Sequence, residues 1–213
     1  MWATFLSWDL QLLHLINEVW AHPALDGVMA VVSSFALFKI PLALGVVALL
    51  IWGGFRERLF LVLMFFCVFL GDMAIDGGLK KAVQRPRPHE YLERVRMVDM
   101  NEVKWSQPHE HPGGNSFPSG HAFNNVAIAL VATVLYGRWA WLLWPWAMLV
   151  SYSRVYTGSH HPSDVLASWG LSLIYTWIVL LVAEWCWQRW AARIFPKLHA
   201  RHPQLIFQKK PIS

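Results

Sequence analysis

Long apolar segments separated by polar loops restrict the possible folds of this chain more than any other feature. A helix needs about 20 mostly apolar residues to cross a bilayer. Only 15% of the 213 residues are charged, whereas about 25% are charged in a typical soluble domain. We therefore predict an all-α fold, a polytopic transmembrane helix bundle that forms one domain over residues 1–213. The five expected spanning helices are residues 26–52, 59–80, 122–136, 139–155 and 165–187.

The N-terminal segment, residues 5–20, differs from these spans. It is short, and its polar residues recur at helical spacing along one face. This pattern is typical of a helix that lies in the membrane interface. We predict an interfacial helix here, with a sixth spanning helix as the alternative. The polar face comprises Ser7, Gln11, His14 and Glu18.

The distribution of basic residues predicts the orientation of the bundle. The formal net charge is +5, and Arg and Lys gather in the short loops 53–58 and 137–138 and in the tail 188–213. Segments rich in these residues usually face the cytoplasm. We therefore predict a basic cytoplasmic tail at 188–213 and an extramembrane loop at 83–117 on the periplasmic side. The sequence has no run of basic and stacking aromatic residues that would indicate nucleic-acid binding.

Three polar stretches lie on the predicted periplasmic side, each beside a spanning segment. They read KKAVQRPRP from Lys80, FPSGHAF from Phe117 and SRVYTGSHHPSD from Ser153. Singly, each has an ordinary structural explanation: cations at a helix end, a serine N-cap at Ser119 and a polar loop. Their coincidence on one face of the bundle predicts a functional site.

The cations of these stretches favour an anionic ligand. Lys80, Arg87 and Arg154 would come together beside the bilayer, where unpaired charges are costly. Guanidinium groups bind phosphate oxygens in bidentate fashion. The backbone N–H groups of Ser119 and Gly120, at the start of a helix, also suit an anion. We infer a phosphoryl group as the ligand.

Histidines and a carboxylate in the same stretches provide groups for phosphoryl transfer. A route through a phosphorylated enzyme needs a nucleophile, a group that orients it and an acid for the leaving oxygen. His121 and one of His160 and His161 fill two of these roles, and Asp164 fills the third. A carboxylate that accepts from one imidazole nitrogen leaves the other nitrogen free to attack.

The order and spacing of these residues resemble the three signature motifs of the type 2 phosphatidic acid phosphatase superfamily. The matching stretches are Lys80-x6-Arg87-Pro88, Pro118-Ser119-Gly120-His121 and Ser153-Arg154-x5-His160-x3-Asp164. The resemblance implies that His160 attacks phosphorus and that Asp164 positions His160 and stabilises its charged form. It implies that His121 protonates the leaving oxygen and then activates water. It also implies that no metal or other cofactor takes part, because the phosphoryl oxygens are bound by Lys80, Arg87, Arg154, Ser119 and Gly120.

Several polar residues near these motifs are expected to have structural roles. Lys81 and Arg85 are expected at the membrane flank or on lipid headgroups. His161 is expected to point away from the site, and Lys39 to serve helix packing or to mark the membrane boundary. Asp72 and Asp76 are expected to form structural ion pairs or hydrogen bonds, with Asp76–Lys80 as one candidate pair. The loop residues His89, His109 and His111 are expected to be solvated rather than to bind a metal.

Taken together, the sequence predicts a membrane lipid phosphatase of the bacterial inner membrane with its site facing the periplasm. Its partners would be the bilayer and a phosphorylated lipid. Candidate substrates are undecaprenyl diphosphate, phosphatidylglycerophosphate, phosphatidic acid and lipid A phosphate. Two alternatives remain open, a lipid phosphotransferase and a non-catalytic binder or transporter of lipid phosphates. The sequence leaves the oligomeric state undetermined.

Overall fold

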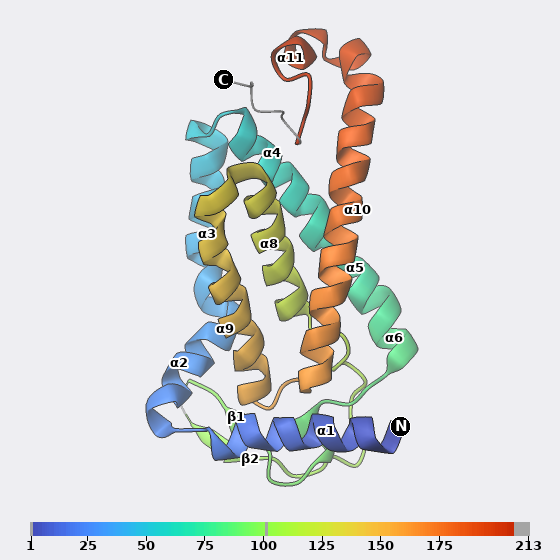
Figure 1. The fold of residues 1–213 in the computed structure, drawn as a ribbon. Coiled ribbons are helices and arrows are strands. Elements are labelled where there is room, and N and C mark those ends of the chain that lie inside the picture. Colours follow the sequence, from blue (N-terminus) through green and yellow to red (C-terminus); the bar gives the residue numbers. More distant parts are fainter. Residues whose placement is uncertain (1, 101, 207–213) are drawn as a thin grey trace.

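The chain forms a bundle of long helices with one helix lying across its end. The computed structural model describes residues 2–100 and 102–206, and the side chains from residue 7 onward except that of Asp76. Figure 1 shows α3, α4, α8, α9 and α10 along the length of the bundle and α1 across its lower end. The two ends of the bundle are therefore built differently, and the sequence motifs all belong to the end that α1 covers.

Six helical units make up the body of the bundle. They are α2 (Pro23–Ser33), α3 (Phe35–Trp52), the run from α4 to α6, α8 (Gly120–Tyr136), α9 (Leu143–Tyr156) and α10 (Pro162–Ile194). The run consists of α4 (Phe55–Met64), the π-helical turn η2 (Phe65–Leu70), α5 (Gly71–Ala74), the π-helical turn η3 (Ile75–Leu79) and α6 (Lys80–Val83). The short 3-10 segment η4 (Gly137–Leu142) joins α8 to α9, and α11 (Pro196–Arg201) follows α10.

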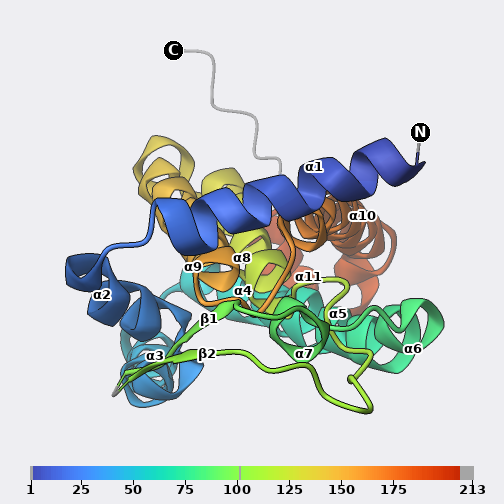
Figure 2. The same ribbon diagram turned by 90° about the horizontal axis from the view of Figure 1, so that it is seen from below.

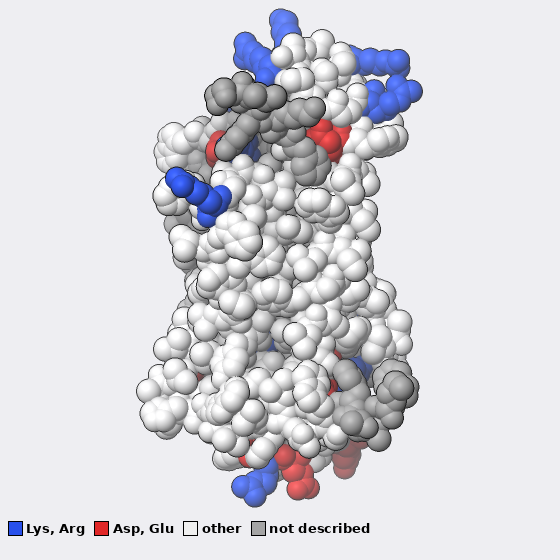
Figure 3. Space-filling view, viewed as in Figure 1, with Lys and Arg blue, Asp and Glu red and all other residues white. Residues whose placement is uncertain are grey.

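The described residues contain four helical runs long and apolar enough to cross a membrane. They are Phe35–Trp52, Phe55–Tyr91, Gly120–Tyr156 and Pro162–Ile194. The third run turns back on itself at η4, so that α8 and α9 lie side by side (Figure 1). Figure 3 shows the charged side chains of this face gathered at the two ends of the bundle, with a largely uncharged band between them. The predicted class, an all-α transmembrane bundle, is confirmed, and five crossings remain a prediction.

The first predicted span, residues 26–52, is two helices rather than one. Helix α3 continues through Lys39 and Pro41, the two residues of this span that are least suited to the interior of an apolar helix. The break lies at Ser34, whose backbone is extended with φ −88° and ψ 103°. The carbonyl of Ser33, at the end of α2, accepts a hydrogen bond of 3.1 Å from Arg154. A side chain from α9 thus satisfies a helix end that the local sequence leaves unpaired.

Two apolar clusters hold the bundle together, one near each end. The cluster beneath α1 includes Leu13, Ile16, Met29, Ala122 and Tyr156. The cluster at the opposite end includes Leu63, Cys67, Val131, Leu180 and Ile206. Helix α8 contributes to both and buries mainly small side chains, which allows its neighbours to approach closely.

The loop 83–117 and the N-terminal helix together cover one end of the bundle. The loop contains α7 (Pro88–Tyr91) and an antiparallel hairpin of β1 (Arg96–Val98) and β2 (Val103–Trp105), in which Arg96 pairs with Trp105. The N-terminal segment comprises α1 (Trp2–His14) and the π-helical turn η1 (Leu15–Val19). Figure 2 shows α1 and the hairpin on opposite sides of the ends of α8, α9 and α10. The crosswise placement of α1 agrees with a helix that lies in the membrane interface.

Candidate active site

The three predicted motifs converge at the end of the bundle that α1 covers. Lys80 begins α6, Arg87 precedes α7, and His121 is the second residue of α8. Arg154 lies in the last turn of α9. Lys80, Arg87 and Arg154 all lie within electrostatic range of the His121 imidazole, so the three cations gather at this end of the bundle. Lys80 and Arg154, which are 74 positions apart in the sequence, are therefore brought to the same end of the bundle.

His160 lies in the loop between α9 and α10 and is only 2% exposed. Its Nδ1 atom is 2.7 Å from the backbone carbonyl of Ser116. Because a carbonyl oxygen only accepts, Nδ1 carries the proton and Nε2 keeps a free electron pair. Burial and the nearby charges of Arg154 and Arg87 hold the pKa of His160 well below its usual value. The imidazole is therefore neutral at physiological pH, the form that a nucleophile requires.

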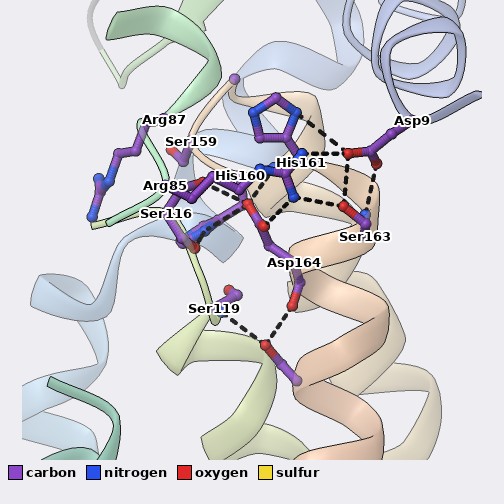
Figure 4. A network of polar contacts seen from close by, with 12 residues as sticks. Asp9, Arg85, Arg87, Ser116, Ser119, Ser159, His160, His161, Ser163 and Asp164 are labelled. Atoms are coloured by element: carbon purple, nitrogen blue, oxygen red, sulfur yellow. Dashed lines mark hydrogen bonds and ion pairs between the residues drawn. The ribbon is translucent and has the colours of Figure 1, made fainter. Parts of the chain in front are cut away.

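Asp164 has a different set of partners from those we predicted. Its Oδ2 atom is 3.9 Å from Nδ1 of His160, beyond hydrogen-bond distance. The carboxylate instead accepts hydrogen bonds from Arg85 Nη1 at 2.6 Å, from the Ser116 hydroxyl at 2.5 Å and from the His161 backbone N–H at 2.9 Å. The predicted direct hydrogen bond to the imidazole is replaced by a link through Ser116, as Figure 4 shows.

Ser116 connects the loop 83–117 to the catalytic histidine candidate, although no sequence pattern singled it out. Its backbone N–H donates to the Arg85 carbonyl at 2.9 Å, its hydroxyl donates to Asp164, and its carbonyl accepts from His160. The serine is fully buried. Ser116 lies three residues before Ser119 of the second motif, and this proximity was the one indication of its role in the sequence. Serine is common in loops, so the position alone did not identify it.

Several buried polar atoms around His160 have no hydrogen-bond partner among the described residues. They include Nε of Arg87, Nε of Arg154 and the hydroxyl of Ser119. Buried donors of this kind are rare in folded proteins and call for an explanation. The other arm of the Arg154 guanidinium is fixed by the carbonyl and hydroxyl of Ser33. An oxyanion bound among these groups would complete their hydrogen bonds.

The start of α8 differs in one detail from the prediction. The backbone N–H of Ser119 donates to the hydroxyl of Ser168 at 2.7 Å and is therefore occupied. The Ser119 side chain, not its backbone, is left for a ligand. Gly120 is the first residue of α8, as expected from the N-cap pattern.

Arg85 contradicts the prediction of a flanking or headgroup-binding residue. Its guanidinium bridges two buried carboxylates, with Nη1 at 2.6 Å from Asp164 and Nη2 at 2.6 Å from Asp9. Nη1 also donates to Ser163 at 2.7 Å. Asp9 comes from α1, which the motif analysis did not consider, so the pairing exists only in the folded chain. Lys81 is exposed, as the flanking role predicted.

The remaining polar residues have mostly local roles. The carboxylate of Asp72 accepts hydrogen bonds from Asn124 at 3.0 and 3.2 Å, which confirms its predicted structural role. The Asp76 side chain, and Lys209 and Lys210 of the tail, lie outside the described residues. Lys39 is exposed, with its Nζ atom 5.8 Å from the Phe35 ring. Within the described part of the chain, His, Cys, Asp and Glu side chains form no group of three that could hold a metal ion, and His89 instead contacts the Gly158 carbonyl.

The His161 imidazole lies beside Asp9 and Tyr91 rather than beside the Ser116 carbonyl that His160 contacts, but it is part of a buried polar network. It is fully buried, with Nδ1 3.7 Å from Asp9 and Nε2 3.4 Å from the Tyr91 hydroxyl. Burial, together with the charge of Arg85, lowers the pKa of His161 to about 4. The neutral imidazole is thus the form that the fold accommodates.

The depressed pKa of His161 predicts a specific loss of stability in acid. Between pH 6.5 and about 4 the unfolded chain binds a proton at His161 and the folded chain does not, so stability falls as the pH falls through this window. The full shift corresponds to about 3 kcal/mol. Melting temperatures in detergent between pH 7 and pH 4 should decline less steeply for His161→Gln than for the wild type. Equal slopes would show that His161 does not titrate in this way.

A family comparison agrees with this geometry. The model of the PAP2 superfamily matches residues 58–188, more than half of the chain. The chain belongs to the PAP2 superfamily. The matched region contains all three motifs, so the resemblance to type 2 phosphatidic acid phosphatases is confirmed.

Individual PAP2 relatives are similar over most of their length. An undecaprenyl-diphosphatase of Sulfolobus acidocaldarius is 27% identical over 84% of this chain and 79% of its own. A lipid A 4'-phosphatase of Porphyromonas gingivalis is 25% identical over 87% of this chain and 76% of its own. The crystal structure of LpxE from Aquifex aeolicus superposes with a TM-score of 0.54 at 25% identity, covering 80% of this chain and 93% of LpxE. The PAP2-type phosphatidylglycerolphosphate phosphatase of Bacillus subtilis has the same fold, with a TM-score of 0.56 at 23% identity over 83% of this chain and 84% of its own. Together with the apolar helices, these relatives identify a multi-pass membrane protein.

Proposed function

We propose that this protein is a membrane lipid phosphatase that removes a phosphate group through a phosphohistidine at His160. The observation that carries the proposal is the neutral His160 imidazole, with Nδ1 bound to the Ser116 carbonyl, near the buried Nε atoms of Arg87 and Arg154, which have no hydrogen-bond partner among the described residues. PAP2 membership and the lipid phosphatases among the relatives support the same reaction class.

The proposed reaction has two steps. In the first, Nε2 of His160 forms a bond to phosphorus, the bond from phosphorus to the leaving oxygen breaks, and His121 donates a proton to that oxygen. In the second, water attacks the phosphohistidine while His121 accepts its proton, which releases inorganic phosphate and frees His160. Arg87, Arg154, Lys80 and Ser119 would bind the phosphoryl oxygens and stabilise the charge that develops on them.

The guanidinium and ammonium groups would supply the positive charge that a metal ion provides in many phosphoryl-transfer enzymes. We therefore expect phosphate release from a lipid phosphate to continue in the presence of a chelator. The measurement is release of inorganic phosphate in detergent with EDTA, from undecaprenyl diphosphate, phosphatidylglycerophosphate, phosphatidic acid and lipid A. Loss of activity with EDTA and recovery with Mg²⁺ would contradict the proposed mechanism.

The same panel separates the alternative functions. Phosphate that appears on an acceptor lipid instead of in solution would indicate a phosphotransferase. Binding without release from any lipid would indicate a non-catalytic binder. The undecaprenyl-diphosphatase and lipid A phosphatases among the relatives make a prenyl diphosphate and lipid A the first substrates to test.

We also propose that the site faces the periplasm of a bacterial inner membrane. The end of the bundle opposite the site carries a basic group comprising Arg56, Arg58, Arg193, Lys197 and Arg201. Figure 3 shows basic side chains over this end, where α11 lies. Basic segments of this kind favour the cytoplasmic side.

A further inference from the structure

Asp9 is a buried carboxylate on a helix that none of the three motifs includes. It is 1% exposed. Its carboxylate accepts hydrogen bonds from the Ser163 backbone N–H at 2.9 Å, the Ser163 hydroxyl at 2.7 Å and Arg85 Nη2 at 2.6 Å. Burial alone would raise the pKa of Asp9, but these hydrogen bonds from Ser163 and Arg85 outweigh it and lower the pKa below its usual value. The side chain is therefore ionised at neutral pH.

An unbroken series of contacts joins Asp9 to the proposed nucleophile. Arg85 bridges Asp9 and Asp164, Asp164 accepts from the Ser116 hydroxyl, and the Ser116 carbonyl accepts from His160. Figure 4 shows Asp9 approaching this network from the side of α1, opposite Arg87. Each link is between buried or half-buried groups, where solvent screens charge only weakly.

Sharing Arg85 between two carboxylates has an electrostatic consequence. One guanidinium carries a single positive charge, and Asp9 and Asp164 together carry two negative charges. Asp164 therefore keeps part of its negative charge, 3.9 Å from Nδ1 of His160. Phosphorylation of Nε2 makes the imidazole cationic, and a nearby negative charge stabilises that cation. Without Asp9, Arg85 would neutralise Asp164 alone.

We propose that Asp9 is a positioning residue for catalysis, through which α1 orients Arg85 and preserves the negative charge of Asp164. The inference rests on the proposed phosphohistidine mechanism. It makes the N-terminal helix a part of the active site rather than only a membrane contact. Asp9 itself does not touch the phosphoryl group.

A purely anchoring role for α1 is already served by other residues. Asn17 donates to the Arg96 carbonyl at 2.9 Å and the Tyr156 carbonyl at 2.7 Å, and Leu13 and Ile16 lie in the apolar cluster beneath the helix. The hydrogen bonds of the Asn17 side chain join it to the backbone of Arg96 and Tyr156 rather than to Arg85 or Asp164. Asn17 therefore provides a matched control, since it is buried in η1, the π-helical turn that continues α1, and is tied to the bundle at different points.

The test compares Asp9→Asn with Asn17→Ala in the full-length protein in detergent. We expect Asp9→Asn to lower kcat by about 10- to 100-fold with KM within about twofold, because the substrate contacts remain and the oriented charge is lost. Asn17→Ala should lower the melting temperature and leave kcat within about twofold. In an Arg85→Gln background, Asp9→Asn should cause no further loss of kcat, because Asp9 acts through Arg85.

Anion binding provides a second readout that does not depend on turnover. Orthovanadate adopts the five-coordinate geometry of a phosphoryl group under attack and bonds to a histidine nitrogen, whereas inorganic phosphate only occupies the anion site. Asp9→Asn should weaken orthovanadate binding by about tenfold or more and leave phosphate binding within about twofold. If the wild type releases no phosphate from any lipid, the proposed function fails, and this comparison still decides the role of Asp9.

Two results would overturn the inference: unchanged kcat and vanadate affinity in Asp9→Asn, or an equal loss of kcat in the wild-type and Arg85→Gln backgrounds. If Asp9→Asn does not fold, Ser163→Ala takes its place, because it removes a hydroxyl that donates to Asp9 at 2.7 Å. A drop in kcat of about threefold or more at constant KM is then expected, and no drop would count against the proposal.

Discussion

The His160→Ala variant should lose turnover by at least about 10⁴-fold, because it removes the atom that forms the bond to phosphorus. The variant should also form no acid-labile phosphoenzyme when wild-type protein does so with labelled substrate. The phosphate-binding groups remain in place, so inorganic phosphate should still bind. Phosphate release from the lipid panel and rapid-quench trapping of the labelled protein measure these outcomes.

His161→Gln is the matched control for this experiment. The two histidines are adjacent and both are buried, but the His161 imidazole contacts Asp9 and Tyr91 instead of Ser116. We expect His161→Gln to keep much of the activity while its stability changes with pH as described above. Loss of the phosphoenzyme in His161→Gln and its retention in His160→Ala would reverse the assignment of the nucleophile.

The second large effect is expected for His121→Asn and depends on the leaving group. A general acid typically accelerates a reaction by about 10²- to 10⁴-fold, and we expect kcat with a lipid monophosphate to fall by about this factor. A substrate whose leaving group is weakly basic, such as p-nitrophenyl phosphate, needs no such proton in the first step. With it, His121→Asn should release one equivalent of leaving group in a burst and then stall as phosphoenzyme, because His121 is also the base for water.

The absorbance of the released p-nitrophenol measures the burst, and rapid-quench trapping measures the stalled phosphoenzyme. His109→Asn is a suitable control, since His109 is an exposed histidine of the loop 83–117. If His121→Asn turns over both substrates with the same reduced rate and accumulates no phosphoenzyme, His121 has neither proposed role.

The sequence singled out the residues proposed to bind the phosphoryl group, but it did not single out the residues that hold them in place. Lys80, Arg87, His121 and Arg154 were recognised because three polar stretches, each ordinary by itself, fall on the same side of the predicted bundle, where unpaired charges are costly. Ser116, Ser168 and Ser33 were not recognised, although each now has a defined hydrogen bond to a site residue or to its backbone. A serine is common in loops and helix ends, so its role depends on neighbours that come from distant parts of the chain.

The roles of the charged residues Arg85 and Asp9 also depend on neighbours from distant parts of the chain, so the sequence did not reveal them. Arg85 lies two positions before Arg87, and nothing in that spacing indicates that its guanidinium faces Asp9 and Asp164 while Arg87 faces the site. The backbone conformation decides this, since Gln84 ends α6 with a positive φ of 49° and turns the chain. Asp9 was not recognised because residues 5–20 were interpreted as a helix with one polar and one apolar face. The structure instead buries Asp9 and Leu13 of α1 together with Ile16 and Asn17 of η1.

By itself, the sequence determined that the chain is a helical membrane bundle of the PAP2 superfamily, because hydrophobic length and motif spacing are local properties. It also predicted a phosphate-binding site at one end of the bundle. The tertiary structure decided how the site is oriented. In the structure, Nδ1 of His160 donates its proton to the Ser116 carbonyl. Asp164 accepts a hydrogen bond from the Ser116 hydroxyl instead of from the imidazole. Asp9 of α1 joins the same buried network through its ion pair with Arg85. These are hydrogen bonds between residues 44 to 154 positions apart, or charges shared among three segments. Such contacts depend on how the helices and loops pack, which no local pattern encodes.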